Sequence, residues 1–381
     1  MTPVVITGAG ILSALGTGRE ENLAKLADAS TAPAMVPPKS FDASKLDAPL
    51  LEVPDFDPAK HLGDKGLRTL DRLTKLLVVA ARLALKDAGI KDAGAFTALS
   101  AERVGVCCSN AYGSLEAISE LDRVAVLEDP RYINPAKFPN TVSNSAAGYI
   151  SIWEELRALN VSVSDGNCGA LDAVRAASLF LVTNRADAIL TGGGEAMSEP
   201  LALAFAKLGV YPAMKLGEGA AFFALETKEK AAARGAKELA TVFGYGTAYV
   251  APAEEVTLLH PSREALARAI RVALADGAVS ADDVDLVVSG ESGIAAFDQA
   301  EAAAITEVLG DRAVLAPKHI IGETLGAGGA LGIAAALAAF GTEGALPGLA
   351  RGTLPARRRT ALVTALGYHG NASALLIKAT G

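Results

Sequence analysis

The sequence predicts an α/β protein that is built from two related halves. Short apolar runs alternate with helical patterns along most of the chain, which is typical of mostly parallel strands that helices cover on both faces. A strand followed by a glycine turn begins such a series at Val4 and again at Leu286. We therefore expect one half over residues 1–245 and a second half over residues 246–381.

The composition predicts a large buried core. The chain has 381 residues, of which 51% are hydrophobic and only 20% are charged. Such a composition indicates elements that are buried on more than one side, or a large interface with another subunit. No apolar run has the length of a membrane span, and the N-terminus opens on a strand pattern without a signal peptide. Because Cys107, Cys108 and Cys168 form no disulfide framework, we expect a cytoplasmic protein that does not act at membranes.

Charge and histidine spacing exclude two further classes of protein. The net charge is −8 and no long basic cluster occurs, so nucleic acid is not expected as a partner. The four histidines are scattered without the spacing of metal ligands, so no metal site is predicted. No cofactor is expected either.

In the N-terminal half, helices are predicted where apolar residues recur at three- and four-residue spacing. They cover residues 20–26, 67–88, 114–127, 146–159, 168–182 and 228–234. Short apolar or alternating runs predict strands over residues 3–8, 104–108, 161–164, 186–190, 222–225 and 239–243. Residues 32–65 are rich in Pro, Asp and Lys and are predicted as a surface excursion, and residues 130–144 as a long polar loop.

The C-terminal half repeats the same alternation of predicted strands and helices. Helices are predicted over residues 263–275, 299–309 and 325–339, and strands over residues 285–289, 360–366 and 373–378. The helices that open at Cys168 and Leu325 are unusually apolar, which indicates a helical layer between two sheets.

The stretch around Cys168 carries the clearest chemical signal. An alternating apolar run ends at Ser164, a polar turn follows, and a helical pattern opens at Cys168. The unpaired N–H groups and the dipole of a helix start favour negative charge, so they lower the pKa of a cysteine placed there. Gly169 and Ala170 leave space for a ligand. Cys168 is therefore a candidate nucleophile, and a buried structural cysteine is the alternative.

Short motifs occur in order from one end of the chain to the other. They are Val4-Val5-Ile6-Thr7-Gly8-Ala9-Gly10, Leu70-Asp71-Arg72, the Cys168 turn, Gly193-Gly194-Glu195-Ala196, Gly217-Glu218-Gly219-Ala220, the Asp298/Glu301 pair, Lys318, Gly326-Ala327-Gly328-Gly329 and the closing Gly367…Gly370-Asn371-Ala372-Ser373. In this order and spacing the chain resembles the β-ketoacyl-ACP synthases, condensing enzymes of the thiolase fold. The resemblance implies that the two halves form a five-layer αβαβα sandwich.

In such enzymes a cysteine takes an acyl chain from acyl carrier protein, and two histidines assist the decarboxylation of a malonyl unit. By this resemblance, Cys168 and Lys318 occupy family site positions. The first histidine position holds Gly290, with Glu291 next to it, and the second holds Glu323. An ionised carboxylate there repels the malonyl carboxylate and donates no hydrogen bond to an oxyanion. A paired carboxylate in an unused pocket is the alternative for Glu323.

The glycine gate of the family is altered and one residue shorter, and it reads Tyr368-His369 between two glycines. His369 offers an imidazole, although a histidine on a glycine loop is more often a turn residue. For Lys318, a salt bridge to Glu301 or Asp298 that holds a loop is the alternative to a catalytic role.

The departures are themselves similar to a known pattern. The stretch Val288-Ser289-Gly290-Glu291-Ser292-Gly293-Ile294 and the stretch Ala316-Pro317-Lys318 resemble those of chain-length factors. These are non-condensing partners of ketosynthases in type II polyketide systems, and they form an acyl tunnel across the interface with the active subunit. Their cysteine position usually holds glutamine, so Cys168 departs from them as well.

Three hypotheses follow. The first is a chain-length-factor subunit, in a type II polyketide or fatty-acid-like system, that pairs with a ketosynthase as a heterodimer, or with itself, and works with acyl carrier protein. The second is an acyltransferase or thioesterase that acts on acyl thioesters through Cys168, without condensation, with Glu291, Glu323 or His369 as the base. The third is a condensing enzyme in which Cys168 is the nucleophile, Lys318 an orienting charge, and the amides of Cys168 and Tyr368 the oxyanion hole.

Acyl carrier protein is acidic and would dock on a basic surface. Lys60, Lys65, Arg68 and Arg72 are the candidates for such a surface, and a solvated helix face is the alternative.

Overall fold

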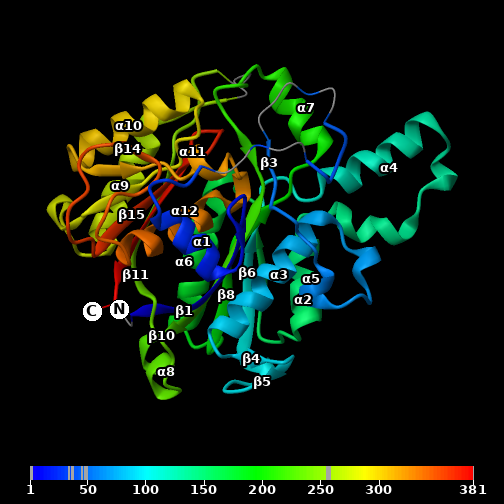
Figure 1. The fold of residues 1–381 in the computed structure, drawn as a ribbon, viewed down its shortest axis with the longest axis horizontal. Helices are drawn as coiled ribbons and strands as arrows, with labels where there is room; N and C mark the ends of the chain where they lie inside the picture. The colour runs from blue at the N-terminus through cyan, green and yellow to red at the C-terminus, as the bar shows by residue number, and fades with distance from the viewer. Residues whose placement is uncertain are drawn as a thin grey trace.

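The computed structural model describes residues 3–32, 35, 38–43, 46, 50–254 and 259–380, so part of the predicted surface excursion lies outside the described residues. Within them, a sheet of twelve strands crosses the molecule, and helices lie against both of its faces (Figure 1). Its order is β14 (Leu349–Arg351), β13 (Ala313–Leu315), β12 (Leu286–Val288), β15 (Thr360–Leu366), β16 (Asn371–Ala379), β11 (Ala240–Tyr249), β1 (Val4–Ser13), β10 (Gly219–Thr227), β8 (Ala188–Glu195), β6 (Val104–Ser109) and β7 (Asn160–Val163), with β2 (Gly16–Thr17) beside β1.

The helices match most of the predicted positions. They are α1 (Arg19–Ala27), α2 (Ala59–Leu62), α3 (Arg72–Asp87), α4 (Leu115–Leu127), α5 (Ser145–Glu154), α6 (Gly169–Val182), α7 (Glu199–Lys207), α8 (Lys228–Ala233), α9 (Arg263–Asp276), α10 (Ala295–Leu309), α11 (Lys318–Ile321) and α12 (Gly328–Phe340). Two small pairs of strands complete the fold, β3 (Leu50–Leu51) with β9 (Leu216–Gly217), and β4 (Lys91–Asp92) with β5 (Ala95–Phe96). In the described chain, no helix has both the length and the apolar character that crossing a bilayer requires.

Short 3₁₀ segments precede or separate several of these elements. They are η1 (Leu67–Thr69), η2 (Ala101–Arg103), η3 (Pro130–Tyr132), η4 (Pro135–Thr141), η5 (Gly166–Cys168), η6 (Ala281–Asp283) and η7 (Leu325–Ala327). Two of them, η5 and η7, lead directly into the two innermost helices, α6 and α12.

The predicted layer of helices between two sheets is confirmed. Within the described part of the twelve-stranded sheet, the N-terminal and C-terminal strands join where Val4–Ile6 of β1 pairs with 240–242 of β11. Helices α6 and α12 pack between the two parts of the sheet, since α6 contacts β8, β6 and β16 and α12 contacts β15, β12 and β10. Helices α3 and α5 cover the outer face of the N-terminal strands, and α9, with α10 against it, covers the C-terminal strands. The order of layers is therefore αβαβα.

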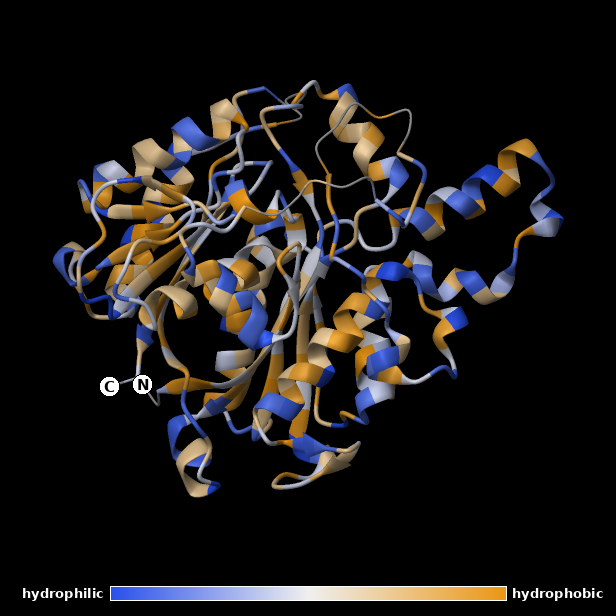
Figure 2. Ribbon diagram, viewed as in Figure 1, coloured by the Kyte–Doolittle hydropathy of each residue, from blue (hydrophilic) through white to orange (hydrophobic). Residues whose placement is uncertain are grey.

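Helix α12 fits this inner position because its side chains are small and apolar. Eleven of its thirteen residues are buried, so it contacts protein on nearly every side. In Figure 2 the strands are mainly orange, whereas the outer helices alternate between orange and blue. The alternation is expected for helices that have one face in solvent.

The expectation of mostly parallel strands is wrong. Parallel pairs occur only toward the two ends of the sheet, between β6 and β7, β6 and β8, β12 and β13, and β12 and β15. The centre is antiparallel, from β8 through β10, β1, β11 and β16 to β15. The alternation of strands and helices does not reveal this, because β15 returns directly into β16 through residues 367–370 without a crossover helix.

Helix α10 begins at Ala295 rather than at 299, and α12 at Gly328 rather than at 325. Two other helix boundaries differ from the predicted ones for identifiable local reasons. Helix α3 begins at Arg72 rather than near residue 67, because the Asp71 side chain accepts a hydrogen bond from the Thr74 amide at 2.7 Å and caps the helix. Helix α5 ends at Glu154 because Glu155 is left-handed, with φ of 56°. Helix α7 and strand β13 were not predicted.

A buried ion pair joins two of the sequence motifs. Arg72 donates to both carboxylate oxygens of Glu218, at 2.8 and 2.5 Å, and Glu218 is fully buried. The Val53 amide donates to the same carboxylate at 2.9 Å. Arg72 is 19% exposed, and its charge is paired with Glu218 and Glu52. It therefore contributes less positive charge to a carrier-protein surface than Lys60 and Arg68, which are exposed. Lys65 is also exposed.

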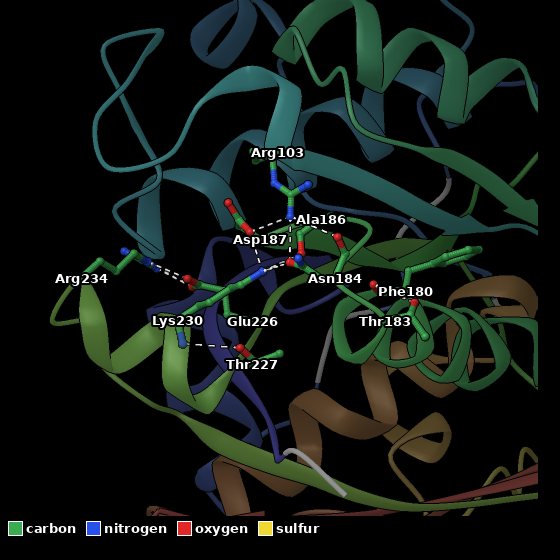
Figure 3. Close-up of polar contacts among 10 residues, drawn as sticks. All are labelled: Arg103, Phe180, Thr183, Asn184, Ala186, Asp187, Glu226, Thr227, Lys230 and Arg234. Carbon is green, nitrogen blue, oxygen red and sulfur yellow. Dashed lines mark hydrogen bonds and ion pairs between the residues drawn. The ribbon is translucent and has the colours of Figure 1, made fainter.

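A polar cluster fastens α8 to the ends of the N-terminal strands (Figure 3). Lys230 donates to Asp187 at 2.5 Å and to Asn184 at 2.7 Å. Arg234 binds both oxygens of Glu226 at 2.7 and 2.6 Å. Because Glu226 is fully buried, this pairing is what makes its charge tolerable inside the protein.

Residues 115–144, which we term the α4 arm, extend away from the body of the molecule (Figure 1). The predicted polar loop of residues 130–144 forms η3 and η4 within it. Several large apolar side chains of the arm are exposed, and four of them are at least 65% exposed: Val126, Leu127, Tyr132 and Phe138. Solvated chains seldom leave so many apolar groups together in water.

Candidate functional site

Cys168 lies at the start of α6, as predicted, but deep in the inner layer. The 3₁₀ turn η5 ends at Cys168, and the residue is the N-cap of α6. Its side chain is fully buried, and its Sγ donates a hydrogen bond to the Ala365 carbonyl of β15 at 3.5 Å. The thiol is therefore packed against a strand of the C-terminal half.

The expected lowering of the Cys168 pKa is contradicted. Burial raises the pKa of the thiol well above its ordinary value, and the carboxylates of Asp172 and Asp165 raise it further. Lys318 acts in the opposite direction but does not prevail. Desolvation of a thiolate outweighs the effect of the helix start, so burial favours the neutral thiol of Cys168.

Asp172, one turn after Cys168, was not predicted as a site residue. Its carboxylate accepts hydrogen bonds from the Tyr245 hydroxyl and the Ser373 hydroxyl, each at 2.6 Å. Burial raises the pKa of Asp172 to about 7. The spacing of four residues places Asp172 on the same helix face as Cys168, which is the signal that could have found it.

Lys318 and Glu323 form a buried ion pair. The Lys318 ammonium lies 2.7 and 2.9 Å from the two oxygens of Glu323, and the side chains are 4% and 1% exposed. The Leu325 amide donates to the same carboxylate at 2.9 Å. Lys318 is thus paired, but with Glu323 and not with the predicted Glu301 or Asp298.

Gly328, the residue after η7, lies against the lysine of this ion pair. A Cβ atom on Gly328 would lie 2.9 Å from Lys318 Cε and 3.2 Å from its Nζ. The lysine side chain therefore runs close to the backbone at the start of α12, and a side chain at residue 328 would displace the end of the lysine.

The position of the first missing histidine is closed by a second carboxylate. The Gly290 amide and the Thr364 hydroxyl both donate to Glu301, at 2.8 and 2.6 Å. A Cβ atom at residue 290 would lie 3.3 Å from that carboxylate. Burial raises the pKa of Glu301 to about 7. Asp298 holds the same loop, because it accepts from the amides of residues 292 and 293.

Glu291 is directed to a different partner. Its carboxylate lies 2.7 Å from the guanidinium of Arg351 on the edge strand β14. The side chain of Glu291 is 7% exposed, so the ion pair takes up its charge near the protein surface.

Tyr368 and His369 occupy the short connection between β15 and β16 but differ in environment. The Tyr368 ring is buried and packs edge-on against Phe297, with centroids 5.1 Å apart. Burial, and next the carboxylate of Glu323, raise the pKa of Tyr368 well above its ordinary value. His369 is exposed, so the structure does not bring its imidazole into the buried cluster.

The structure thus brings four of the predicted site residues into one buried cluster, which are Cys168, Lys318, Glu323 and Tyr368. Gly290 is bound separately, through its amide, to Glu301. Charge in the cluster is largely compensated, since the ammonium is bound to a carboxylate. Within the described residues, no three His, Cys, Asp or Glu side chains are placed to hold a metal ion.

Replacing Glu301 by Gln should change how stability depends on pH. Burial raises the pKa of Glu301 from 4.5 to about 7, so the folded protein holds this proton more tightly than the unfolded chain. The resulting stabilisation is complete below about pH 4.5 and is lost as the pH rises through about 7. In that window, the free energy of unfolding of the wild type should fall relative to Glu301→Gln by up to about 1.4 kcal/mol per pH unit.

Urea unfolding of both proteins across this window measures the difference. Glu307→Gln on the same helix is the matched control, because Arg271 and Arg263 lower the pKa of the exposed Glu307 and its titration falls below the window. Parallel pH profiles for the wild type and Glu301→Gln would contradict the assignment.

Known proteins resemble this chain over nearly its whole length. It is 30% identical to a 3-oxoacyl-[acyl-carrier-protein] synthase 2 of Coxiella burnetii, over 86% of this chain and 83% of that protein. It is 32% identical to the tetracenomycin polyketide synthase ketoacyl synthase alpha subunit of Streptomyces glaucescens, over 90% and 86% of the two chains. The solved ishigamide ketosynthase/chain length factor superposes with a TM-score of 0.85 over 100% of both chains, at 27% identity.

Two family matches account for most of the sequence. Residues 1–231 match the family described as beta-ketoacyl synthase, N-terminal domain, and residues 239–350 match beta-ketoacyl synthase, C-terminal domain. The five-layer arrangement of the structure is the thiolase fold of ketosynthases. The chain therefore belongs to the β-ketoacyl synthase family.

Proposed function

We propose that the chain is a ketosynthase-like subunit of the chain-length-factor type, which condenses nothing by itself and pairs with an active ketosynthase. In this role it forms part of the acyl tunnel in polyketide or fatty-acid-type elongation. The observation that carries the proposal is the buried Lys318–Glu323 ion pair at the position where the second imidazole is expected.

The ion pair removes the chemistry that decarboxylation needs. Loss of carbon dioxide from a malonyl thioester leaves an enolate, and preorganised hydrogen-bond donors stabilise its oxygen. Glu323 has no proton to donate while it is ionised, and the Lys318 ammonium is already engaged by both of its oxygens. Position 290 offers only a backbone amide, which is bound to Glu301. His319 and His369, the histidines nearest in sequence, are exposed.

An apolar surface supports a partner subunit. The α4 arm and the adjoining α5 expose large apolar side chains, which are Ile118, Val126, Leu127, Tyr132, Phe138, Val142 and Ile152. Among the strands that the structure describes, β7 lies at the end of the sheet and pairs with β6 alone, so its outer edge is free to pair with another chain. The solved protein described as a ketosynthase/chain length factor has the same fold and supports a partner of ketosynthase type.

Charge substitutions in the α4 arm should abolish the pairing. We expect Leu127→Asp and Phe138→Asp to lose co-purification with an active β-ketoacyl synthase co-expressed from the same organism, because a buried unpaired carboxylate costs several kcal/mol. Val272→Asp is the matched control, since Val272 is 49% exposed on the outer helix α9. Loss of the complex in the control alone, or in none of the variants, would contradict the proposed interface.

Retention of Cys168 favours one other function, an acyltransferase or thioesterase that works through this thiol. Intact-mass spectrometry of the purified chain with acyl-ACP distinguishes the two. A neutral, fully buried thiol should take up no acyl group, and Cys168→Ala should leave elongation by the paired complex within about twofold of the wild type. An acyl adduct on the isolated wild type that Cys168→Ala lacks would favour the acyltransferase.

A further inference from the structure

A hollow of about 550 Å³ lies on the outer side of the N-terminal layer, away from Cys168. It is framed by α2, the C-terminal part of α3, the β4–β5 hairpin and the end of α5 (Figure 1). Its ionisable lining residues come from distant parts of the sequence and are Lys60, His61, Arg82, Lys86, Lys91, Asp92 and Glu154. We term it the Lys60–Lys86 hollow.

The floor of this hollow is a fixed polar framework. Glu154 is 2% exposed, and the Arg82 guanidinium contacts its carboxylate at 2.7 Å. Lys91 is 6% exposed and donates to the Glu154 carbonyl at 2.9 Å. Its ammonium also lies 4.9 Å from the centre of the Phe96 ring. These contacts hold two cationic groups in place without a bound ligand.

The rim carries positive charge that the protein does not neutralise. Lys86 follows Arg82 by one helical turn on the same face of α3, and Lys60 faces the hollow from α2. Within the described residues, neither Lys60 nor Lys86 has a carboxylate within 4.0 Å. Among the lining residues, four cationic groups stand against the two carboxylates of Asp92 and Glu154. Asp57, which acts on His61 from beside the hollow, is a third carboxylate, so an excess of one positive charge remains.

This excess stands out against the charge of the whole chain. The net charge is −8, so the protein as a whole repels anions, and only a local concentration of cations can bind one. Burial lowers the pKa of His61, which lines the same hollow. Burial therefore favours the uncharged imidazole, which can donate one N–H to a ligand.

We propose that the Lys60–Lys86 hollow binds a small molecule that carries a diphosphate or a similar multiply charged phosphate group. Phosphate oxygens accept several charge-assisted hydrogen bonds at once, which matches ammonium groups that converge from α2, α3 and β4. The volume exceeds that of a single phosphate ion, and the concave shape suits a compact ligand rather than a flat protein surface. The proposal does not rest on pairing with a ketosynthase, and it gives Lys60 a role other than the carrier-protein surface for which the sequence makes it a candidate.

Isothermal titration calorimetry at low ionic strength tests the site, with inorganic pyrophosphate and adenosine diphosphate as probes. We expect one binding site per chain for at least one probe. The double variant Lys60→Ala/Lys86→Ala should weaken binding about tenfold or more, since charge-assisted contacts are lost. The probe that binds more tightly shows whether the free diphosphate or a nucleoside-linked one is preferred.

Two further variants keep the result interpretable. Lys207→Ala/Lys237→Ala makes the same change in net charge at exposed lysines elsewhere and should bind like the wild type. Lys60→Arg/Lys86→Arg keeps the charge and should keep the binding. Circular dichroism confirms that each variant is folded. No binding of either probe to the wild type, or an equal loss in both alanine variants, would overturn the proposal.

Discussion

The buried ion pair between Lys318 and Glu323 determines what the rest of this structure can do. Two opposite charges inside a protein are tolerated when they form an ion pair. The Lys318 and Glu323 side chains are 4% and 1% exposed, so water does not solvate them and each depends on the other. The pair holds α11 against the start of α12, where the lysine runs close to Gly328, and it places a carboxylate beside Tyr368. A site that stabilises an oxyanion needs hydrogen-bond donors that are free to bind it. Here the Lys318 ammonium already donates to both oxygens of Glu323.

Cys168 illustrates how the same burial acts on the nucleophile position. A helix start favours a thiolate by a modest amount, and this effect is visible from sequence spacing alone. The opposing effect, loss of hydration in the inner layer, depends on α12 and on β15, and the β15 residue that Cys168 contacts lies 197 positions further along the chain. The sign of the pKa shift therefore follows from the tertiary structure, and the local pattern predicted the wrong direction.

Much of the architecture was predictable from the sequence, because it depends on local patterns. Apolar periodicity is local, so the inner helices α6 and α12 and the strand β15 were placed within a few residues of their bounds. Strand direction was not readable, because pairing at β1 and β11 joins residues 4–6 to 240–242. The ion pair between Arg72 and Glu218 was not predictable for the same reason, because the two residues lie 146 positions apart in the sequence and only the fold brings them together. Asp172 was predictable as a neighbour of Cys168, because the two residues are four positions apart on one helix. Thr364 and Ser373 lie on distant strands, so local spacing does not connect them to the site.

The claim that the chain does not condense is tested most directly by carbon dioxide release from radiolabelled malonyl-ACP. The purified chain alone should release none above the level of a heat-denatured sample, because no group at residue 290 or 323 donates to the enolate. Adding an active ketosynthase partner should start the release. Release by the isolated wild type that disappears in Lys318→Ala would contradict the account, because it would show that the ion pair opens to perform the chemistry itself.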